Sequence, residues 1–304
     1  MGCTGLFTEL YCEGPMTALF ALATSLLWGL ADFGGGLLAR RTPALTVVVV
    51  SQTVAALVLG AIVLVTQAWG AAGPRLWFAV AAGLVGPVAM LAFYKALALG
   101  PMGVVSPLGS LGVAVPVGIG LVLGERPGPV RCAGIAVAVV GVLLAGGPQF
   151  RGAPVQRRAV LLTLLAAFGF GAVMALIAEA SSTLTGLFLA LFVQRVTNVV
   201  TGGTALYVRV RRGGPARPRI ARGRQVPLGA LPAFAFVGLA DVAANGTYAL
   251  AAQRGPVAVA AVLASLYPVV TALAARGFLG ERLRGAQAAG AGLALVGTVL
   301  LATG

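Results

Sequence analysis

The chain has 304 residues, of which 59% are hydrophobic and only 9% are charged, with a mean hydropathy of +1.00. A soluble domain of this length needs far more polar side chains to cover its surface, so the composition excludes one and predicts a membrane protein with several spans. The net charge of +14 comes from short blocks between apolar runs. These blocks lack the aromatic and basic face that holds a nucleic-acid strand, so nucleic-acid binding is not expected.

The chain begins with an N-terminal extension, residues 1–15, which is neither basic nor strongly apolar and does not resemble a signal peptide. Met16 stands directly before the first long apolar run, so the extension is either a disordered leader or precedes the true start. The chain has no histidine, and its three cysteines lack metal-ligand spacing. No metal or other cofactor is therefore expected, and a disulfide between Cys3 and Cys12 stays open.

Ten long apolar segments follow, most of them separated by short Gly/Pro connectors. They are about as long as a helix needs to be to cross a hydrocarbon core of roughly 30 Å, so the sequence predicts an all-α polytopic membrane protein. A polar, arginine-rich loop at 208–225 separates the seventh segment from the eighth. The predicted spans are 16–38, 44–66, 76–99, 103–123, 129–147, 158–178, 184–208, 227–252, 256–278 and 284–303.

The second half of the chain repeats the first. The run LGER at 123–126, before the last apolar segment of the first half, returns at 279–282 before the last segment of the chain. Chance rarely keeps several matched pairs at one offset, so the sequence predicts two five-helix repeats, 16–147 and 158–303. Other matches are Gly100-Pro101 with Gly255-Pro256 and Ser110-Leu111 with Ser265-Leu266, both 155 residues apart, and Trp28-Gly29 with Phe170-Gly171 and Gln52 with Gln194, both 142 residues apart.

An odd number of spans in each repeat means that the second copy enters the membrane from the opposite side. Inverted repeats of this kind recur in secondary transporters, where the solute is bound near the midplane between the halves. Rocking of one half against the other then opens the site to alternate sides of the membrane.

The basic residues divide unequally between the two sides. Loops after odd-numbered spans, together with the adjoining span ends, hold 15 arginines, and those after even-numbered spans hold 4. Lys95 and Arg195, deeper inside spans, complete the 21 basic residues. The positive-inside rule therefore places the arginine-rich loops in the cytoplasm and both termini outside.

Two five-helix repeats, each with a Gly-Glu-Arg turn before a Gly-rich last helix, resemble the EamA-type transporters of the drug/metabolite transporter superfamily. WGLADFGGGLLARR at 28–41 and YKALALGPMGVVSPLGSLGVAVP at 94–116 are similar to its bacterial members, and the resemblance covers nearly the whole chain. It implies a multi-pass protein of the cytoplasmic (inner) membrane of a bacterium, a monomer or a homodimer.

The resemblance also implies which helices form the transport cavity. In such transporters the first, third, fourth, sixth, eighth and ninth helices line it, and the fifth and tenth lie at the periphery, where they pack or dimerise. Many members have both termini in the cytoplasm, opposite to the orientation that the arginine count predicts. The family exports or imports amino acids, sugars, nucleotides, drugs and other metabolites, so the resemblance fixes no substrate.

Four charged residues stand out inside the predicted spans, where a charge costs roughly 2.5–3.5 kcal/mol at the centre on insertion scales. Their depths pair Asp32 with Lys95 and Arg195 with Asp241. The pairs either neutralise each other and hold helices in register, or handle substrate or protons directly. Lys95 has a further alternative, which is to snorkel to the interface.

Uncharged polar residues on the predicted cavity helices can hydrogen-bond a small polar solute between apolar walls, although packing is the commoner role of a lone serine in a span. Gln52 and Gln194 stand out because the repeat places both alike, and bonds between helices are their commonest use. The other candidates are Tyr94, Ser106, Ser110, Asn245, Tyr248, Ser265 and Tyr267.

The two Gly-Glu-Arg turns are predicted to be structural and to lie on opposite faces of the membrane. Glu125 and Glu281 can each cap the following helix or pair with the adjacent Arg126 or Arg282, and a gating ion pair is the alternative. Prolines that interrupt spans either act as hinges or only shape the helix. They are Pro107, Pro116 and Pro268.

Together these features favour a secondary transporter that moves a small metabolite or drug by alternating access, as an exporter or an importer. A proton gradient, an exchange or the solute's own gradient would drive it. An enzyme is not expected, because the chain lacks histidine, a nucleophile beside a base, paired carboxylates and a phosphate-binding loop. The alternative is a non-transporting membrane protein or a component of a flippase for lipid-linked substrates. The predicted partners are a small-molecule substrate and the lipid bilayer, with protons as an option.

Overall fold

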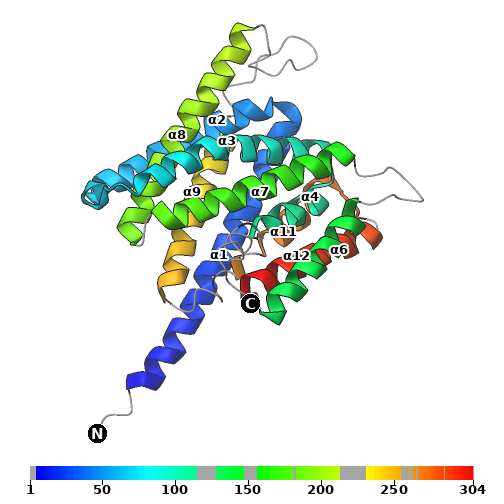
Figure 1. The fold of residues 1–304 in the computed structure, drawn as a ribbon, viewed down its shortest axis with the longest axis horizontal. Coiled ribbons are helices and arrows are strands. Elements are labelled where there is room, and N and C mark those ends of the chain that lie inside the picture. The colour runs from blue at the N-terminus through cyan, green and yellow to red at the C-terminus, as the bar shows by residue number, and fades with distance from the viewer. Residues whose placement is uncertain are drawn as a thin grey trace.

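The computed structural model describes residues 5–113, 115, 128–146, 156–180, 183–212, 231–254, 260, 263–264, 266–283 and 285–303. Within these ranges the chain is all-α, with ten α-helices and two short 3-10 helices, η1 and η2 (Figure 1). The first half forms α1 (Gly5–Arg41), α2 (Ala44–Val65), η1 (Ala68–Ala71), α3 (Leu76–Leu99), α4 (Met102–Gly109), η2 (Ser110–Val113) and α6 (Pro129–Gly146). The second half forms α7 (Arg157–Ala180), α8 (Leu184–Arg211), α9 (Leu231–Arg254), α11 (Tyr267–Leu279) and α12 (Gly285–Thr303).

Every predicted span has a helix at its position. Six of the described helices, α1, α2, α3, α7, α8 and α9, are long and apolar enough to cross a membrane. Shorter apolar helices, α4, α6, α11 and α12, stand at the fourth, fifth, ninth and tenth predicted spans. The fourth and ninth spans, 103–123 and 256–278, fall only partly within the described residues.

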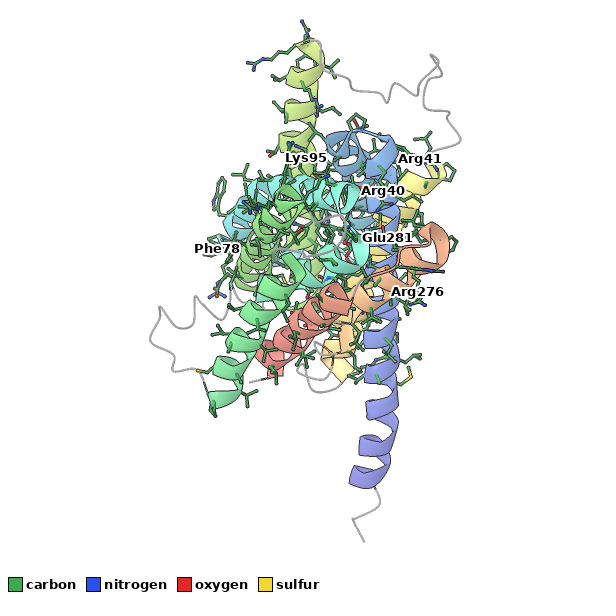
Figure 2. The ribbon with its side chains drawn as sticks, turned by 90° about the vertical axis from the view of Figure 1, so that its right-hand side faces the viewer. Arg40, Arg41, Phe78, Lys95, Arg276 and Glu281 are labelled. Atoms are coloured by element: carbon green, nitrogen blue, oxygen red, sulfur yellow. The ribbon has the colours of Figure 1, made fainter. Side chains whose placement is uncertain are left out.

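Large apolar side chains cover the outer faces of the helices. Trp77 is 75% exposed and Phe278 80%, and Phe78, labelled in Figure 2, is also exposed. A soluble protein rarely exposes such extensive apolar surface, whereas lipid tails solvate it. These faces are the lipid-facing surface of a membrane protein.

The most extensive helix contacts join one half of the chain to the other. α1 packs on α9 as α7 packs on α3, and α2 packs on α9 as α8 packs on α3. The repeat matches α1 with α7, α2 with α8 and α3 with α9. Replacing each helix by its match therefore turns the α1–α9 contact into the α7–α3 contact, and the α2–α9 contact into the α8–α3 contact. The contacts of α2 with α8 and of α6 with α12 map onto themselves. The main packing therefore follows a pseudo-two-fold axis, which relates two inverted five-helix repeats.

The matched dipeptides Trp28-Gly29 and Phe170-Gly171 occupy equivalent contacts. A Cβ on Gly29 of α1 would stand 2.7 Å from the Tyr267 carbonyl oxygen of α11, and a Cβ on Gly171 of α7 would collide with the backbone of Gly112 in η2. Only glycine allows these close approaches of backbone to backbone. The sequence repeat is thus also a repeat of helix contacts.

One contact departs from this symmetry. Near the C-terminal ends of α1 and α3, the ring of Tyr94 fills the space beside Gly35, and Leu97 fills the space beside Gly36. The equivalent helices α7 and α9, both of which the structure describes, make no comparably extensive contact. α1 and α3 therefore close one end of the bundle, and α7 and α9 do not close the other in the same way.

Residues 5–15 are helical, so the expectation of a disordered leader is wrong for this stretch. They continue α1, whose 37 residues correspond to about 55 Å at 1.5 Å per residue. Figure 1 shows this helix extending well beyond the bundle toward the N-terminus. Each residue added to an existing helix forms one further backbone hydrogen bond, so the helix extends easily from its buried part toward the N-terminus. The side chains of Cys3 and Cys12 lie outside the described part of the chain.

The prolines differ in their positions. Pro107 lies within α4, which ends two residues later and continues as the 3-10 turn η2. Pro268 stands in the first turn of α11, where its missing N–H is not needed. The predicted span 256–278 is therefore interrupted beside Pro268, where a turn at Leu266 separates the helical residues 263–264 from α11. Pro116 lies outside the described residues.

Candidate functional site

A buried polar network lies where α2, α8 and α9 meet. The Oε1 atom of Gln52 on α2 accepts hydrogen bonds of 3.0 Å from Arg195 Nη1 and from Asn198 Nδ2, both on α8. Arg195 Nη2 lies 2.7 Å from Oδ2 of Asp241 on α9. The network ties the two halves together at a depth where an unpaired charge would be costly.

The ion pair between Arg195 and Asp241 that depth predicted is present, and its partners differ in exposure. The Arg195 side chain is 9% exposed and that of Asp241 is 21% exposed. Asn245, one turn along α9, donates to the Asp241 carbonyl oxygen at 2.7 Å and approaches its Oδ1 at 3.4 Å. Arg195 is thus a fixed, buried cation, whereas Asp241 also borders more accessible space.

Asp32 on α1 is the second carboxylate of this region, and its predicted pairing with Lys95 is wrong. In the part of the chain that the structure describes, Asp32 forms no ion pair. Its electrostatic neighbours are Asp241 and the hydroxyl of Ser106, which is buried and makes no hydrogen bond of standard geometry. Asp32 also lies near the hydroxyl groups of Tyr94 and Tyr267. Among the described residues it is therefore a carboxylate without a fixed cation.

Rotation about the α3 axis explains the position of Lys95. Tyr94 takes the face of α3 that contacts α1 at Gly35. The next residue of an α-helix is turned by about 100°, so Lys95 lies to the side of that face and is partly exposed (Figure 2). Depth within a span, on which the predicted pair depended, does not determine this rotation.

A cluster of three aromatic rings lies at the level of α1 that carries Asp32. The ring centroid of Trp28 on α1 lies 6.0 Å from that of Tyr248 on α9 and 6.1 Å from that of Tyr267 on α11. Trp28 precedes Asp32 by four residues, so the two side chains share one face of α1. The corner between α1, α9 and α11 thus combines a carboxylate with three electron-rich rings, and we term it the aromatic corner.

The equivalent corner, between α7, α3 and η2, is apolar. Its ring pair is Phe170 with Phe93, with centroids 5.5 Å apart. The same arrangement of helices therefore carries polar and charged groups in one copy and hydrophobic groups in the other. The equivalent positions are Trp28 and Phe170, Tyr248 and Phe93, Tyr267 and Gly112, and Asp32 and Met174.

The remaining candidates lie apart from the aromatic corner. Gln194 is buried, and among the described residues its Oε1 has no hydrogen-bond partner. The Ser110 hydroxyl donates to the Pro107 carbonyl at 2.8 Å and lies 3.1 Å from Thr298 Oγ1, so it ties η2 to α12. Among the described residues, no group of three His, Cys, Asp or Glu could hold a metal ion. Ser265, Glu125 and Arg126 lie outside the described residues.

Glu281 joins three helices at one end of the bundle. Arg40 at the end of α1 donates to Glu281 Oε1 at 2.6 Å, and the backbone N–H of Met102 at the start of α4 donates to Oε2 at 2.9 Å. Glu281 thus caps α4, neutralising the positive end of its dipole, and pairs across the halves. The prediction that it caps the following helix or pairs with the adjacent Arg282 is wrong, because the turn directs its carboxylate toward α1 and α4.

Sequence reasoning missed two residues of this region, Asn198 and Trp28. In the sequence repeat Trp28 stands out only as the match of Phe170. The stronger signal is the difference between matched positions, since an aromatic pair with a polar edge and a nearby aspartate occurs in one copy only. Asn198 lies one turn from Gln194 on α8, a spacing that places both on one helix face.

These features define a class: an all-α membrane protein of two inverted five-helix repeats with a polar site between them, as in secondary transporters. A family model described as the EamA-like transporter family matches residues 15–147 and again residues 157–303. The chain belongs to the EamA-like transporter family and is a membrane transport protein, not an enzyme.

Comparison with individual proteins adds the fold. No curated protein matches the chain significantly. A solved crystal structure of a protein is similar, with 21% sequence identity and a TM-score of 0.58, covering 93% of this chain and 95% of its own. At this identity the likeness shows a shared fold and says nothing of the substrate.

Proposed function

We propose that the protein is a secondary transporter for a small metabolite or drug that carries a positively charged amine on an apolar body. The observation that carries this proposal is the Asp32 carboxylate, which has no ion pair among the described residues and lies near Tyr267 and one helical turn from Trp28, whose ring adjoins those of Tyr248 and Tyr267. A cation gains about 0.5–2 kcal/mol over an aromatic face, and a carboxylate adds a charge-assisted hydrogen bond. The aromatic corner suits such a solute better than an anion or a sugar.

In this proposal Arg195 and Asp241 position the site and do not bind the solute. Arg195 is already engaged by Gln52 and Asp241, and its burial leaves little access for a solute anion. Asp241 is already engaged by its ion pair with Arg195, at 2.7 Å. Asp32 is then the group that releases the amine in exchange for a proton, and Asp241 is not the proton carrier.

Alternating access follows from the asymmetry between the two ends. The end with Arg40 and Glu281 is sealed by the contact of α1 with α3 and by the Glu281 junction, whereas α7 and α9 make no comparable contact. Transport requires the α1–α3 contact to open as α7 and α9 approach. Because each half packs mainly on the other, the moving bodies combine helices of both halves, in place of one whole half rocking against the other.

A flux assay in proteoliposomes tests this function. A panel of labelled amines, amino acids and sugars is presented with and without a proton gradient, and we expect gradient-driven flux of a hydrophobic amine such as phenethylamine. Flux of neutral or anionic solutes alone, unchanged in Asp32→Asn, would contradict the amine assignment. If none of the solutes in the panel is transported, the result would favour the alternative, a non-transporting membrane protein or a flippase component.

The orientation in a bacterial cytoplasmic membrane is part of the proposal. The arginine distribution supports a cytoplasmic position for the end with Arg40 and Arg41, with both termini outside. In a cysteine-free background, a cysteine at Gly304 should react with an impermeant reagent added to whole cells, and one at Gly214 should not. The reverse pattern would overturn this orientation. Accumulation of the amine in inside-out vesicles would establish export.

A further inference from the structure

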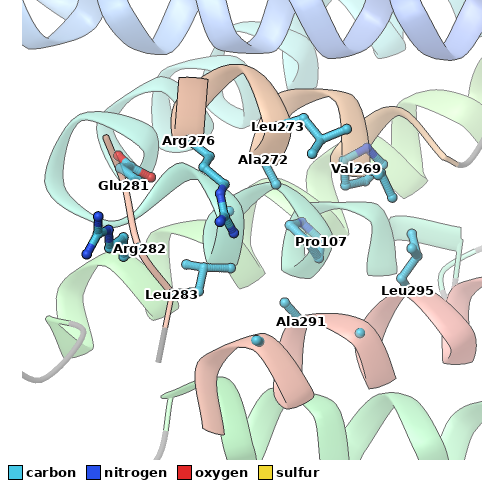
Figure 3. Close-up of a pocket in the computed structure, with 14 residues that line it drawn as sticks. Pro107, Val269, Ala272, Leu273, Arg276, Glu281, Arg282, Leu283, Ala291 and Leu295 are labelled. Atoms are coloured by element: carbon cyan, nitrogen blue, oxygen red, sulfur yellow. The ribbon is translucent and has the colours of Figure 1, made fainter. Parts of the chain in front are cut away.

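A groove of about 600 Å³ opens between α4, α11 and α12 (Figure 3). It lies on the opposite side of α11 from α1, since Thr271 bonds the Gly29 carbonyl of α1 at 3.0 Å while neighbouring residues of α11 line the groove. Its volume falls within the range of small-molecule sites, roughly 300–1,000 Å³. The apolar walls include Pro107, Val269, Leu273, Leu283, Ala291 and Leu295.

The charged residues among the described lining of the groove gather at one end. Arg276 and Arg282 line it there, and within the described residues neither forms an ion pair. Glu281 lies between them in sequence, but its oxygens are engaged by Arg40 at 2.6 Å and by the Met102 N–H at 2.9 Å. Figure 3 shows the side chain of Arg276 reaching from α11 toward the space between α11 and α12. Two guanidinium groups with no acidic partner in the described part of the chain therefore adjoin an apolar groove.

Arg276 and Arg282 lie near the helix ends, at the level expected for the membrane–water interface. α11 ends at Leu279 and α12 begins at Gly285, so the turn that carries Arg282 lies at the ends of two membrane helices. Basic residues at such a level attract anionic lipid headgroups, while the groove continues along the helices toward the hydrocarbon core.

We infer that the groove binds one anionic phospholipid, with an acyl chain between α11 and α12 and its phosphate on Arg276 and Arg282. Charge complementarity selects this occupant, because guanidinium groups bind phosphate oxygens bidentately. A zwitterionic lipid carries its own ammonium group and gains less. The bound lipid braces α4, α11 and α12 beside the Glu281 junction and so stabilises the sealed end.

Native mass spectrometry of the full-length protein tests this site by titration with phosphatidylglycerol and with phosphatidylcholine of the same chains. The double variant Arg276→Gln/Arg282→Gln should bind phosphatidylglycerol roughly 25-fold more weakly, at about fivefold for each arginine, with phosphatidylcholine unchanged. The matched control is Arg209→Gln/Arg212→Gln at the end of α8, which removes the same charge and should leave binding unchanged.

A second variant tests the apolar part of the groove. Gly292 lines the groove, and a Cβ there would meet no atom within 4 Å, so Gly292→Leu should fill the groove without a clash. It should weaken phosphatidylglycerol binding with both arginines intact. Equal affinity in the wild type, the arginine variant and Gly292→Leu would overturn the proposal. Competition by inorganic phosphate at equal concentration would point to a phosphate site, and dissociation of a dimer by Gly292→Leu would point to a second copy as the occupant.

Discussion

The aromatic corner and its equivalent in the other half share a backbone and differ in chemistry. Gly29 and Gly171 make equivalent close contacts, yet the rings beside them are tryptophan and tyrosines in one copy and phenylalanines in the other. Close packing restrains the glycines equally in both copies. The rings beside these glycines are not restrained in this way and can differ between the copies. The chemistry of the site therefore comes from the positions at which the two halves differ.

The ion pair shows the same division. Thr53 stands at the position equivalent to Arg195, and Gly86 at that equivalent to Asp241. A Cβ on Gly86 would lie 2.6 Å from Asn198 Oδ1, so a larger residue there would displace the side chain that bonds Gln52. The crossing of α2, α8 and α9 therefore contains the Arg195–Asp241 ion pair. At the equivalent crossing of α8, α2 and α3, the matching positions hold the uncharged residues Thr53 and Gly86.

The largest expected effect is on stability, from Arg195→Met. It leaves Asp241 unpaired within the membrane and should lower the free energy of unfolding by roughly 3–5 kcal/mol, measured by denaturant unfolding in detergent. The double variant Arg195→Met/Asp241→Leu should recover most of this loss. Thr53→Val at the equivalent position should change stability by less than about 0.5 kcal/mol. A double variant as unstable as the single one would contradict a structural role for the pair.

Asp32→Asn should have the next largest effect, this time on transport. Loss of a charge-assisted bond worth about 1.5–3 kcal/mol should reduce amine flux roughly 10- to 100-fold while unfolding stays unchanged. The matched control, Met174→Leu, alters the equivalent position of the apolar corner and should transport normally. Equal loss in both variants would mean that Asp32 has no special role.

Converting the aromatic corner to the ring pair of its equivalent should have a moderate effect. Trp28→Phe/Tyr248→Phe keeps two rings but weakens their attraction for a cation, so the apparent KM for the amine should rise about three- to tenfold. The reciprocal change, Phe93→Tyr, should leave KM unchanged. An effect on kcat alone would argue against direct contact with the solute.

The smallest expected effect comes from the partly exposed ion pair at the sealed end. The side chains of Arg40 and Glu281 are 29% and 17% exposed, so solvent screens their attraction. Glu281→Gln should cost about 1 kcal/mol of stability, and less at high salt. A loss as large as that of Arg195→Met would show that the two ion pairs are energetically alike.

The sequence predicted the architecture well because apolar length and repeated dipeptides report directly on membrane spans and helix crossings. It also paired Arg195 with Asp241 correctly from their depth. The same reasoning failed for Asp32 and Lys95, because depth leaves the rotation of each helix undetermined. The contacts of Glu281 with α1 and α4 were also beyond reach, since a turn's own sequence does not show which distant helix ends approach it.

The interlocking of the halves has a consequence for biosynthesis. The main packing partners of α1, α2, α3 and α6 all lie in the second half, so the first half enters the bilayer before any of them exists. At about 5–20 residues per second, that interval lasts roughly 8–30 s. The inserted helices survive it because their backbone hydrogen bonds are internal. The side chain of Gln52, however, has no hydrogen-bond partner in lipid until Arg195 and Asn198 are inserted. In a chain truncated after residue 147 it stays exposed. We expect membrane proteases to recognise such a chain by this exposed polar group.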